Sequence, residues 1–183
     1  MKKVVLLGDS IRLNGYGTVI SKYLPKNVTV YQHEANDRFS KNLLVAISLD
    51  LENLKDADVI HFNAGLWDSS LMIGDNKPIS DVKEYVNNMS RIADILLKIT
   101  PKVIFSTITP NKSTHKDNSI KTTMLYNKKV TKMLVKKGVI INDLFSVINE
   151  DIDSYICEDN LHLNEKGIKA AAESVSKAIL KIL

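Results

Sequence analysis

The most informative stretch for the architecture of this chain is Val4-Val5-Leu6-Leu7-Gly8-Asp9-Ser10. Four consecutive apolar residues that end at a glycine are typical of a short buried strand followed by a tight turn. The run is shorter than the roughly 7–15 apolar residues that form the core of a secretory leader. We therefore interpret residues 4–7 as the first strand of a sheet, with Ser10 just beyond its carboxyl end.

Four further apolar segments have the length and β-branched content of strands, and helical patterns separate them. The strands are predicted at residues 28–31, 59–62, 103–107 and 139–142, and the longer helices at residues 81–99, 120–137 and 164–183. Strands that alternate with helices form a parallel sheet covered on both faces. We predict an α/β fold, a three-layer α/β/α sandwich with a flavodoxin-like five-stranded parallel sheet in the order 2-1-3-4-5. The length of 183 residues favours one domain over residues 1–183.

Local signals predict several helix ends. Ser40 and Ser80 are each placed to cap a helix that follows them. Gly138 is placed to end a helix in the left-handed conformation. Residues 18–24 are predicted to form a short helix before Pro25.

Composition excludes several classes of protein. Apolar residues make up 44% of the chain and charged residues 25%, which is ordinary for a globular domain. The net charge of +4 comes from scattered lysines, so we expect no nucleic-acid partner. No apolar run approaches the roughly 20 residues of a membrane span, so we expect no membrane insertion. One cysteine excludes an internal disulfide and favours a cytoplasmic location. No residue spacing indicates a metal site or a bound cofactor, and nothing in the sequence specifies an oligomeric state.

The residues that could carry chemistry lie near the two ends of the sequence. Ser10 follows the first predicted strand, and Asp159 and His162 stand three positions apart. A serine hydroxyl is a weak nucleophile until a base takes its proton, and a histidine base needs a third group to fix its tautomer. The order Ser, Asp, His is that of α/β-hydrolases, although their Gly-x-Ser-x-Gly motif is absent. We predict Ser10 as the nucleophile, His162 as the general base and acid, and Asp159 as the group that orients His162.

These residues, in Gly8-Asp9-Ser10-Ile11 and Asp159-Asn160-Leu161-His162, resemble the motifs of the GDSL, or SGNH, hydrolase family. The resemblance covers most of the chain and implies the same three-layer sandwich, ester hydrolysis, and a structural role for Asp9. It also implies three donors to an oxyanion: the backbone N–H of Ser10, the side-chain amide of Asn63, and the backbone N–H at the position of Arg38.

The chain departs from the family pattern at two positions. His61 stands where the family has a glycine two residues before Asn63, and Arg38 aligns with the glycine whose N–H belongs to the oxyanion hole. A backbone N–H survives the replacement of glycine by arginine, but the conformational freedom of glycine does not. The side chain of Arg38 could instead bind an anionic group of the substrate.

Several other side chains are candidates for the wall of the cleft. Trp67 and Tyr16 are placed to flank it, and Trp67 could stack on a sugar ring or simply pack. Arg12 could contact a polar substrate or be a surface charge. Among the remaining histidines, His61 is expected to pack within its strand. His33 and His115 lie in polar segments and are expected to be exposed to solvent.

The sequence therefore predicts a serine esterase that cleaves a small acyl ester, with acetyl on a carbohydrate as the preferred substrate. The closest alternatives are lysophospholipid or thioester hydrolysis and acyl transfer to another sugar. A different class of function is a non-catalytic module that binds a small molecule in the same crevice, which the missing glycine at Arg38 favours. Replacement of Ser10 by alanine distinguishes the two classes, because only catalysis depends on its hydroxyl.

Overall fold

The computed structural model describes residues 1–183, and its central element is one parallel β-sheet. The strands are β1 (Lys2–Leu7), β2 (Val28–Gln32), β3 (Val59–Asn63), β4 (Val103–Ser106) and β5 (Ile140–Asn142). The longer helices are α2 (Ser40–Leu49), α4 (Val82–Ile99), α5 (Ile120–Lys136) and α8 (Glu165–Leu180). The short helices are α1 (Ser10–Leu13), α3 (Leu51–Leu54), α6 (Leu144–Asn149) and α7 (Ile152–Tyr155).

The strand order is β2-β1-β3-β4-β5, which confirms the predicted fold. The register aligns Leu7 at the end of β1 with Phe62 near the end of β3, and Phe62 with Phe105 in β4. The strands consist mostly of apolar residues, because both faces of a parallel sheet are buried. Every residue of β3 and β4 is buried.

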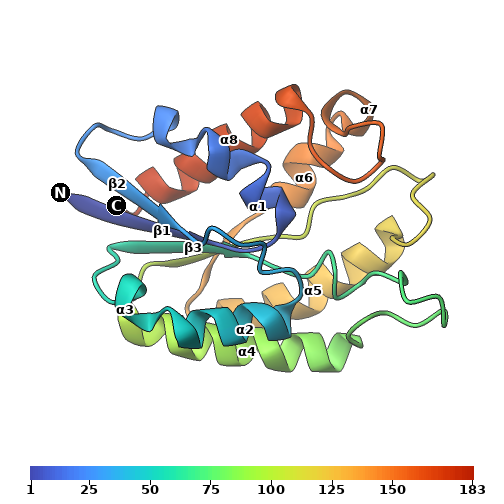
Figure 1. Ribbon diagram of the computed structural model, residues 1–183, viewed down its shortest axis with the longest axis horizontal. Coiled ribbons are helices and arrows are strands. Elements are labelled where there is room, and N and C mark those ends of the chain that lie inside the picture. Colours follow the sequence, from blue (N-terminus) through green and yellow to red (C-terminus); the bar gives the residue numbers. More distant parts are fainter.

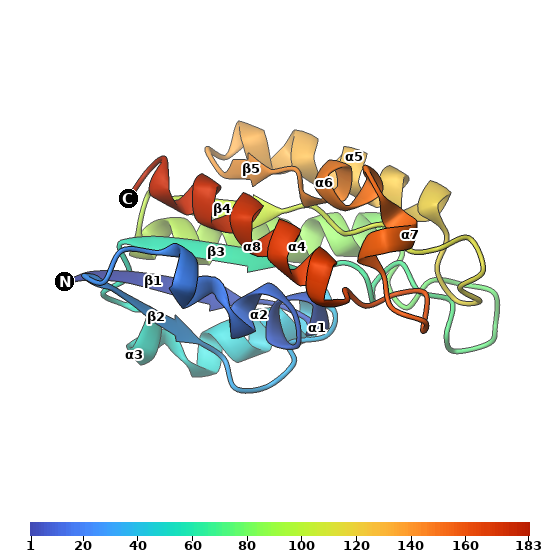
Figure 2. The same ribbon diagram turned by 90° about the horizontal axis from the view of Figure 1, so that it is seen from above.

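Helices cover the sheet in two layers. Helices α1, α6 and α8 lie over one face, and α2, α4 and α5 lie over the other (Figures 1 and 2). The helices of each layer pack against one another, with α6 and α7 against α8 on the first side and α4 against both α2 and α5 on the second. The carboxyl ends of the strands point toward the same side of the molecule, where α1 begins and the long loops lie (Figure 1).

Some local predictions need correction. Asp81, not Ser80, caps α4, since its carboxylate accepts the N–H groups of Lys83 and Glu84. Ser40 begins α2 but does not cap it, because its hydroxyl donates to the buried carboxylate of Asp68. The predicted helix at 18–24 is replaced by two 3₁₀ segments, Tyr16–Thr18 and Ile20–Tyr23. Gly138 does adopt the left-handed conformation, with φ of 89°.

Candidate active site

The topology brings Ser10, His162 and Asp159 into one hydrogen-bonded line. The Ser10 hydroxyl lies 2.9 Å from Nε2 of His162, and Nδ1 of His162 lies 2.7 Å from Oδ2 of Asp159. Ser10 comes from the turn after β1, whereas the other two residues lie 149 and more positions later. Both distances are within the range in which a base can take a proton from a nucleophile and be oriented by a third group.

The turn that carries the acid-base pair is organised by Asp159 itself. Its Oδ1 accepts the backbone N–H groups of Leu161 and His162, each at 2.9 Å, while its Oδ2 faces the imidazole ring. Asn160 adopts a left-handed conformation with φ of 66°, which asparagine tolerates better than most residues. A pairing of Ile156 with Leu163 closes the base of the turn. The spacing of three residues is therefore what lets one carboxylate fix both the backbone and the ring.

Hydrogen bonding also determines the ionisation of Asp159. Partial burial raises its pKa, but the N–H groups of Leu161 and His162 and the ring of His162 outweigh that effect and leave the pKa below its ordinary value. Asp159 is therefore ionised at neutral pH. An ionised carboxylate holds the Nδ1–H tautomer of His162 and leaves Nε2 free to accept the serine proton.

Ser10, the predicted nucleophile, sits in a tight turn between β1 and α1. Asp9 is the N-cap of α1 and accepts the N–H of Ile11, which brings Ser10 to the first helical position. At that position the N–H of Ser10 has no partner within the helix. Gly8 has φ of +139°, and a Cβ there would overlap the side-chain oxygen and the backbone carbonyl of Asn63. Only glycine allows β1 and the end of β3 to approach this closely.

Asn63, the predicted oxyanion donor, lies at the end of β3 and contacts Asp9, the residue before Ser10. Its Nδ2 donates to Oδ1 of Asp9 at 2.6 Å, and its Oδ1 accepts the Tyr16 hydroxyl at 3.1 Å. An amide nitrogen carries two protons, so one remains after the bond to Asp9. The expected structural role of Asp9 agrees with these contacts.

Arg38 adopts the left-handed conformation that glycine would supply more easily, with φ of 53°. Its backbone N–H donates to Oδ1 of Asn36 at 2.8 Å, so this N–H already has a partner within the loop. Its guanidinium lies 5.8 Å from the centre of the Trp67 ring, within the range of a cation–π interaction. The strain of a left-handed arginine, roughly 1–2 kcal/mol, is tolerated because the preceding residue is held firmly.

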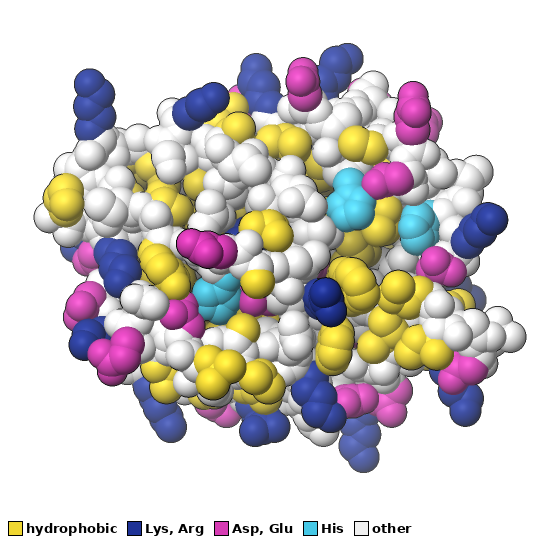
Figure 3. All heavy atoms as spheres, viewed as in Figure 1, with side chains coloured by type: hydrophobic (Ala, Val, Ile, Leu, Met, Phe, Trp, Pro, Cys, Tyr) yellow, Lys and Arg dark blue, Asp and Glu magenta, His cyan; other side chains and the backbone are white.

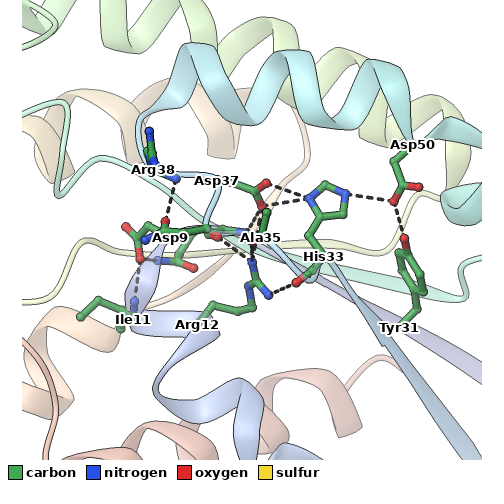
Figure 4. A network of polar contacts seen from close by, with 12 residues as sticks. Asp9, Ile11, Arg12, Tyr31, His33, Ala35, Asp37, Arg38 and Asp50 are labelled. Atoms are coloured by element: carbon green, nitrogen blue, oxygen red, sulfur yellow. Dashed lines mark hydrogen bonds and ion pairs between the residues drawn. The ribbon is translucent and has the colours of Figure 1, made fainter.

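Asp37, the residue before Arg38, joins the loop after β2 to the turn that carries Ser10. Oδ2 of Asp37 accepts the N–H of Gly8 at 2.8 Å, and the N–H of Asp37 donates to the Gly8 carbonyl at 3.2 Å. Figure 4 shows that Asp37 also faces His33 and the guanidinium of Arg12. The turn after β1 and the loop after β2 are therefore joined by reciprocal bonds.

The prediction that Arg12 contacts substrate is wrong, because its side chain is 0% exposed. Its guanidinium donates to the carbonyls of His33, Gly8 and Ala35. Figure 4 shows the bond to His33. A planar group with five N–H donors can satisfy carbonyls from several chain segments at once. Arg12 is therefore a structural residue that holds the turn after β1 and the loop after β2 together.

Two other predictions about exposure are also wrong. His33 is only 8% exposed, and its two ring nitrogens face the carboxylates of Asp37 and Asp50 (Figure 4). Tyr16 is 0% exposed and lies beneath Asn63 instead of flanking the cleft. His61 packs in its strand as predicted, fully buried.

A cleft of about 340 Å³ opens in front of Ser10 and His162. Its wall includes Leu66 and the partly exposed Trp67, as predicted for the latter. In Figure 3, hydrophobic side chains gather beside histidine side chains at the end of the molecule to which the carboxyl ends of the strands point. The remaining lining residues are Asn14, Asn36, Ser70, Met72, His115, Asp117, Asn118 and Leu161.

The loop after β4 supplies three of these residues, which sequence reasoning missed. Nδ1 of His115 accepts the backbone N–H groups of Asp117 and Asn118, at 3.3 and 3.2 Å. Since Nδ1 is an acceptor, the ring proton is on Nε2. The amide of Asn118 donates to the carbonyl of Leu66 and ties this loop to the one after β3. The only available signal was the length and polarity of the loop.

No group of three or more His, Cys, Asp or Glu side chains is arranged so that it could hold a metal ion. No helix is both long enough and apolar enough to cross a bilayer.

Comparisons with known proteins support the fold strongly, although no family model and no curated protein matches the sequence. An α/β hydrolase from the metagenome of Lake Arreo, LAE5, superposes with a TM-score of 0.84 at 14% identity, over 100% of this chain and 96% of that one. A lipase/acylhydrolase from Enterococcus faecalis gives 0.79 at 19% identity, over 98% and 95%. An acetylxylan esterase from Geobacillus stearothermophilus gives 0.84 at 16% identity, over 97% and 94%.

These solved structures share the architecture that the GDSL/SGNH resemblance implied. The chain therefore has the fold of lipases/acylhydrolases and acetylxylan esterases along its whole length.

The buried role of Arg12 predicts a large effect of a conservative substitution. Arg12→Lys lowers the free energy of unfolding by about 2–4 kcal/mol, because the single nitrogen of an ammonium cannot occupy both positions from which the two guanidinium nitrogens reach three buried carbonyls. The measurement is urea denaturation followed by circular dichroism, with the exposed Arg91→Lys as the matched control. Equal stability of the two variants would contradict the structural role of Arg12.

The ionisation of Asp9 predicts how stability depends on pH. Burial raises the pKa of Asp9 from 3.8 to about 6, although Ile11, Asn63 and Arg12 favour the charged form. The native state therefore binds this proton more tightly than the unfolded state, and stability falls as pH rises from about 4 to about 6. Asp9→Asn keeps an oxygen for both hydrogen bonds and removes the charge. We expect it to raise the free energy of unfolding at pH 7.5 by up to about 3 kcal/mol.

Urea denaturation of wild type and Asp9→Asn at pH 4, 5, 6 and 7.5 measures this effect. The difference in the free energy of unfolding between Asp9→Asn and wild type grows from about pH 4 to about pH 6 and then levels off. A difference that is constant with pH would show that Asp9 has an ordinary pKa.

Proposed function

We propose that this protein is a serine esterase that hydrolyses esters of short acyl groups, with Ser10, His162 and Asp159 as its catalytic residues. The observation that carries the proposal is the continuous line of hydrogen bonds from Ser10 through His162 to Asp159 at the mouth of the cleft. The fold shared with lipases/acylhydrolases and acetylxylan esterases supports it.

The reaction begins with the transfer of the Ser10 hydroxyl proton to Nε2 of His162. Oγ of Ser10 attacks the acyl carbon, and the carbonyl oxygen becomes an oxyanion. The intermediate collapses by breaking the bond to the alcohol oxygen, which takes the proton from His162. A water molecule then attacks the acyl-enzyme, gives its proton to His162, and releases the acid as the proton returns to Ser10.

Two donors are assigned to the oxyanion. They are the backbone N–H of Ser10, at the first position of α1, and the second Nδ2 proton of Asn63. The N–H of Arg38 becomes a third donor only if an oxyanion displaces the side chain of Asn36 from it. Removal of one such donor costs about 3–4 kcal/mol of transition-state stabilisation in other enzymes.

The cleft favours a small, polar leaving group. A volume of about 340 Å³ suits a short acyl group with part of an alcohol, and the wall combines the Trp67 ring with polar groups. The Nε2–H of His115 is a donor and the carboxylate of Asp117 is an acceptor, which together match an alcohol with neighbouring hydroxyl groups. An acetylated carbohydrate has this chemistry, and acetylxylan esterases share the fold.

Hydrolysis of p-nitrophenyl acetate by wild type and Ser10→Ala tests the mechanism. We expect kcat/KM to fall by more than about 10³-fold in Ser10→Ala, because no other group can form the acyl-enzyme. Ser69→Ala is the control, since this buried serine donates to the Leu66 carbonyl and does not line the cleft. Equal rates in wild type and Ser10→Ala, with matched circular dichroism, would remove Ser10 as the nucleophile.

The role assigned to His115 is tested by His115→Asn, because an asparagine Oδ1 can replace Nδ1 as the acceptor of the two backbone N–H groups. The variant loses only the Nε2–H donor. We expect kcat/KM to fall at least about tenfold more for an acetylated xylo-oligosaccharide than for p-nitrophenyl acetate, whose leaving group has no neighbouring hydroxyl. An equal loss for both substrates would argue against recognition of the leaving group by His115.

A further inference from the structure

A chain of buried polar side chains runs beneath the site, across the sheet and away from the cleft. It begins at Asp9 and Asn63 and continues through Tyr16 and His61 to Ser106 in β4. Beyond Ser106 it reaches Asn142 at the end of β5 and Ser174 in α8. From Asp9 to Asn142 the exposed fraction of each residue is between 0% and 7%. The proposed mechanism uses only Asn63 among these residues.

The protons of this chain all point in one direction. An ionised Asp9 can only accept, so the group of Asn63 that faces it at 2.6 Å is the amide nitrogen. The oxygen of Asn63 then faces Tyr16, whose hydroxyl must donate to it at 3.1 Å. The tyrosine oxygen is left as an acceptor toward Nδ1 of His61, 3.5 Å away.

The far half of the chain fits the same direction. Ser106 accepts the Nδ2–H of Asn142 at 3.0 Å, so its own proton can go to Nε2 of His61 at 2.8 Å. The Nδ1–H of His61 then points to Tyr16. Burial lowers the pKa of His61 to about 3 and raises that of Tyr16 well above its usual value. Both groups are thus uncharged across the neutral range, and the hydrogen bonds keep their direction.

The two contacts of Asn63 determine where its remaining proton points. The bond to Asp9 fixes the direction of one N–H but leaves the amide plane free to rotate about that bond. The bond from Tyr16 to the amide oxygen removes this rotation. The second N–H lies in the same plane, so its direction is set as well.

We propose that Tyr16, supported by His61, is a positioning residue that fixes the amide plane of Asn63 so that its second N–H points at the oxyanion. This inference rests on the proposed esterase function. It gives a role to His61, at the position where the family resemblance implied a glycine. A glycine there would offer Tyr16 no imidazole to contact, whereas the histidine places its ring edge-on to Tyr16 at 5.5 Å between centroids.

Steady-state kinetics of Tyr16→Phe with p-nitrophenyl acetate tests this role. We expect kcat to fall about tenfold with KM within about twofold, because a misdirected donor weakens the transition state more than substrate binding. Tyr126→Phe is the matched control. Tyr126 is 2% exposed, and its hydroxyl donates to the Ser80 carbonyl, which is not part of the chain of buried polar side chains. Tyr126→Phe loses a buried hydrogen bond of the same kind and keeps kcat within about twofold of wild type.

A double-mutant cycle separates positioning from a general loss of packing. In the Asn63→Ala background there is no amide to orient, so Tyr16→Phe causes no further loss of kcat, whereas in wild type it does. A full tenfold loss in both backgrounds, a change in KM instead of kcat, or an unchanged kcat would each overturn the inference. In these cases Ser10→Ala still abolishes turnover, and the proposed function stands.

The same cycle run on urea unfolding gives a readout that does not depend on activity. Tyr16→Phe and Asn63→Ala are expected to couple, because they share one hydrogen bond, whereas Tyr126→Phe and Asn63→Ala are expected to add. Additive effects of Tyr16→Phe and Asn63→Ala would overturn the inference even if the protein showed no turnover dependent on Ser10.

Discussion

The close approach of β1 to the end of β3 at Gly8 and Asn63 is the constraint on which the rest of the site depends. The parallel register places Leu7 beside Phe62, so the next residues along, Gly8 just past β1 and Asn63 at the end of β3, lie side by side. Any side chain at Gly8 would occupy the space of the Asn63 amide. The contact puts the turn that carries Ser10 and the proposed oxyanion donor, Asn63, within one hydrogen-bonded cluster, before any residue from the C-terminal third of the chain takes part.

This cluster contains many polar groups that the protein has to satisfy without water. Asp9, Asp37, Asp68 and Arg12 are each at most 3% exposed, and every one of them bonds backbone or side-chain groups of another segment of the chain. Each buried bond contributes only about 1 kcal/mol net, but leaving a partner unpaired costs more. The cluster therefore behaves as a unit, in which the loss of one member leaves others unsatisfied. Its value lies in holding three loops in one arrangement, more than in added stability.

The sequence was sufficient to predict the features that depend on local patterns. The strand order follows from the alternation of apolar runs with helical spacing, and Ser10, Asp159 and His162 follow from motif spacing and chain order. Trp67 was also placed correctly at the cleft. These signals lie within a few residues of one another or repeat regularly along the chain.

The errors share a different physical origin. Arg12 was expected to reach substrate because the sequence shows its charge but not the three carbonyls that surround it, which come from the nucleophile turn and from the loop after β2. Tyr16 was misplaced for the same reason, since its partner Asn63 is distant in sequence. His33 was misplaced because one of the two carboxylates that face it, Asp50, comes from the end of α2. His115 was set aside because its role depends on the conformation of a long loop. The surroundings of these polar residues depend on how the loops fold against one another, which local sequence patterns do not show.

The two halves of the site differ in how far they are exposed to solvent, and this difference matches the roles proposed for them. Ser10 and Asn63 are each 5% exposed and held by the sheet, whereas the side chains of His162 and Asp159 are 36% and 49% exposed. An exposed ion pair contributes little to stability, so the His162 ring depends for its orientation on the turn that Asp159 makes with its own backbone. In the proposed mechanism, charge develops beside the rigid half, on an oxyanion that needs donors already in place. The half proposed to exchange protons with the leaving group and with water is the half that solvent reaches.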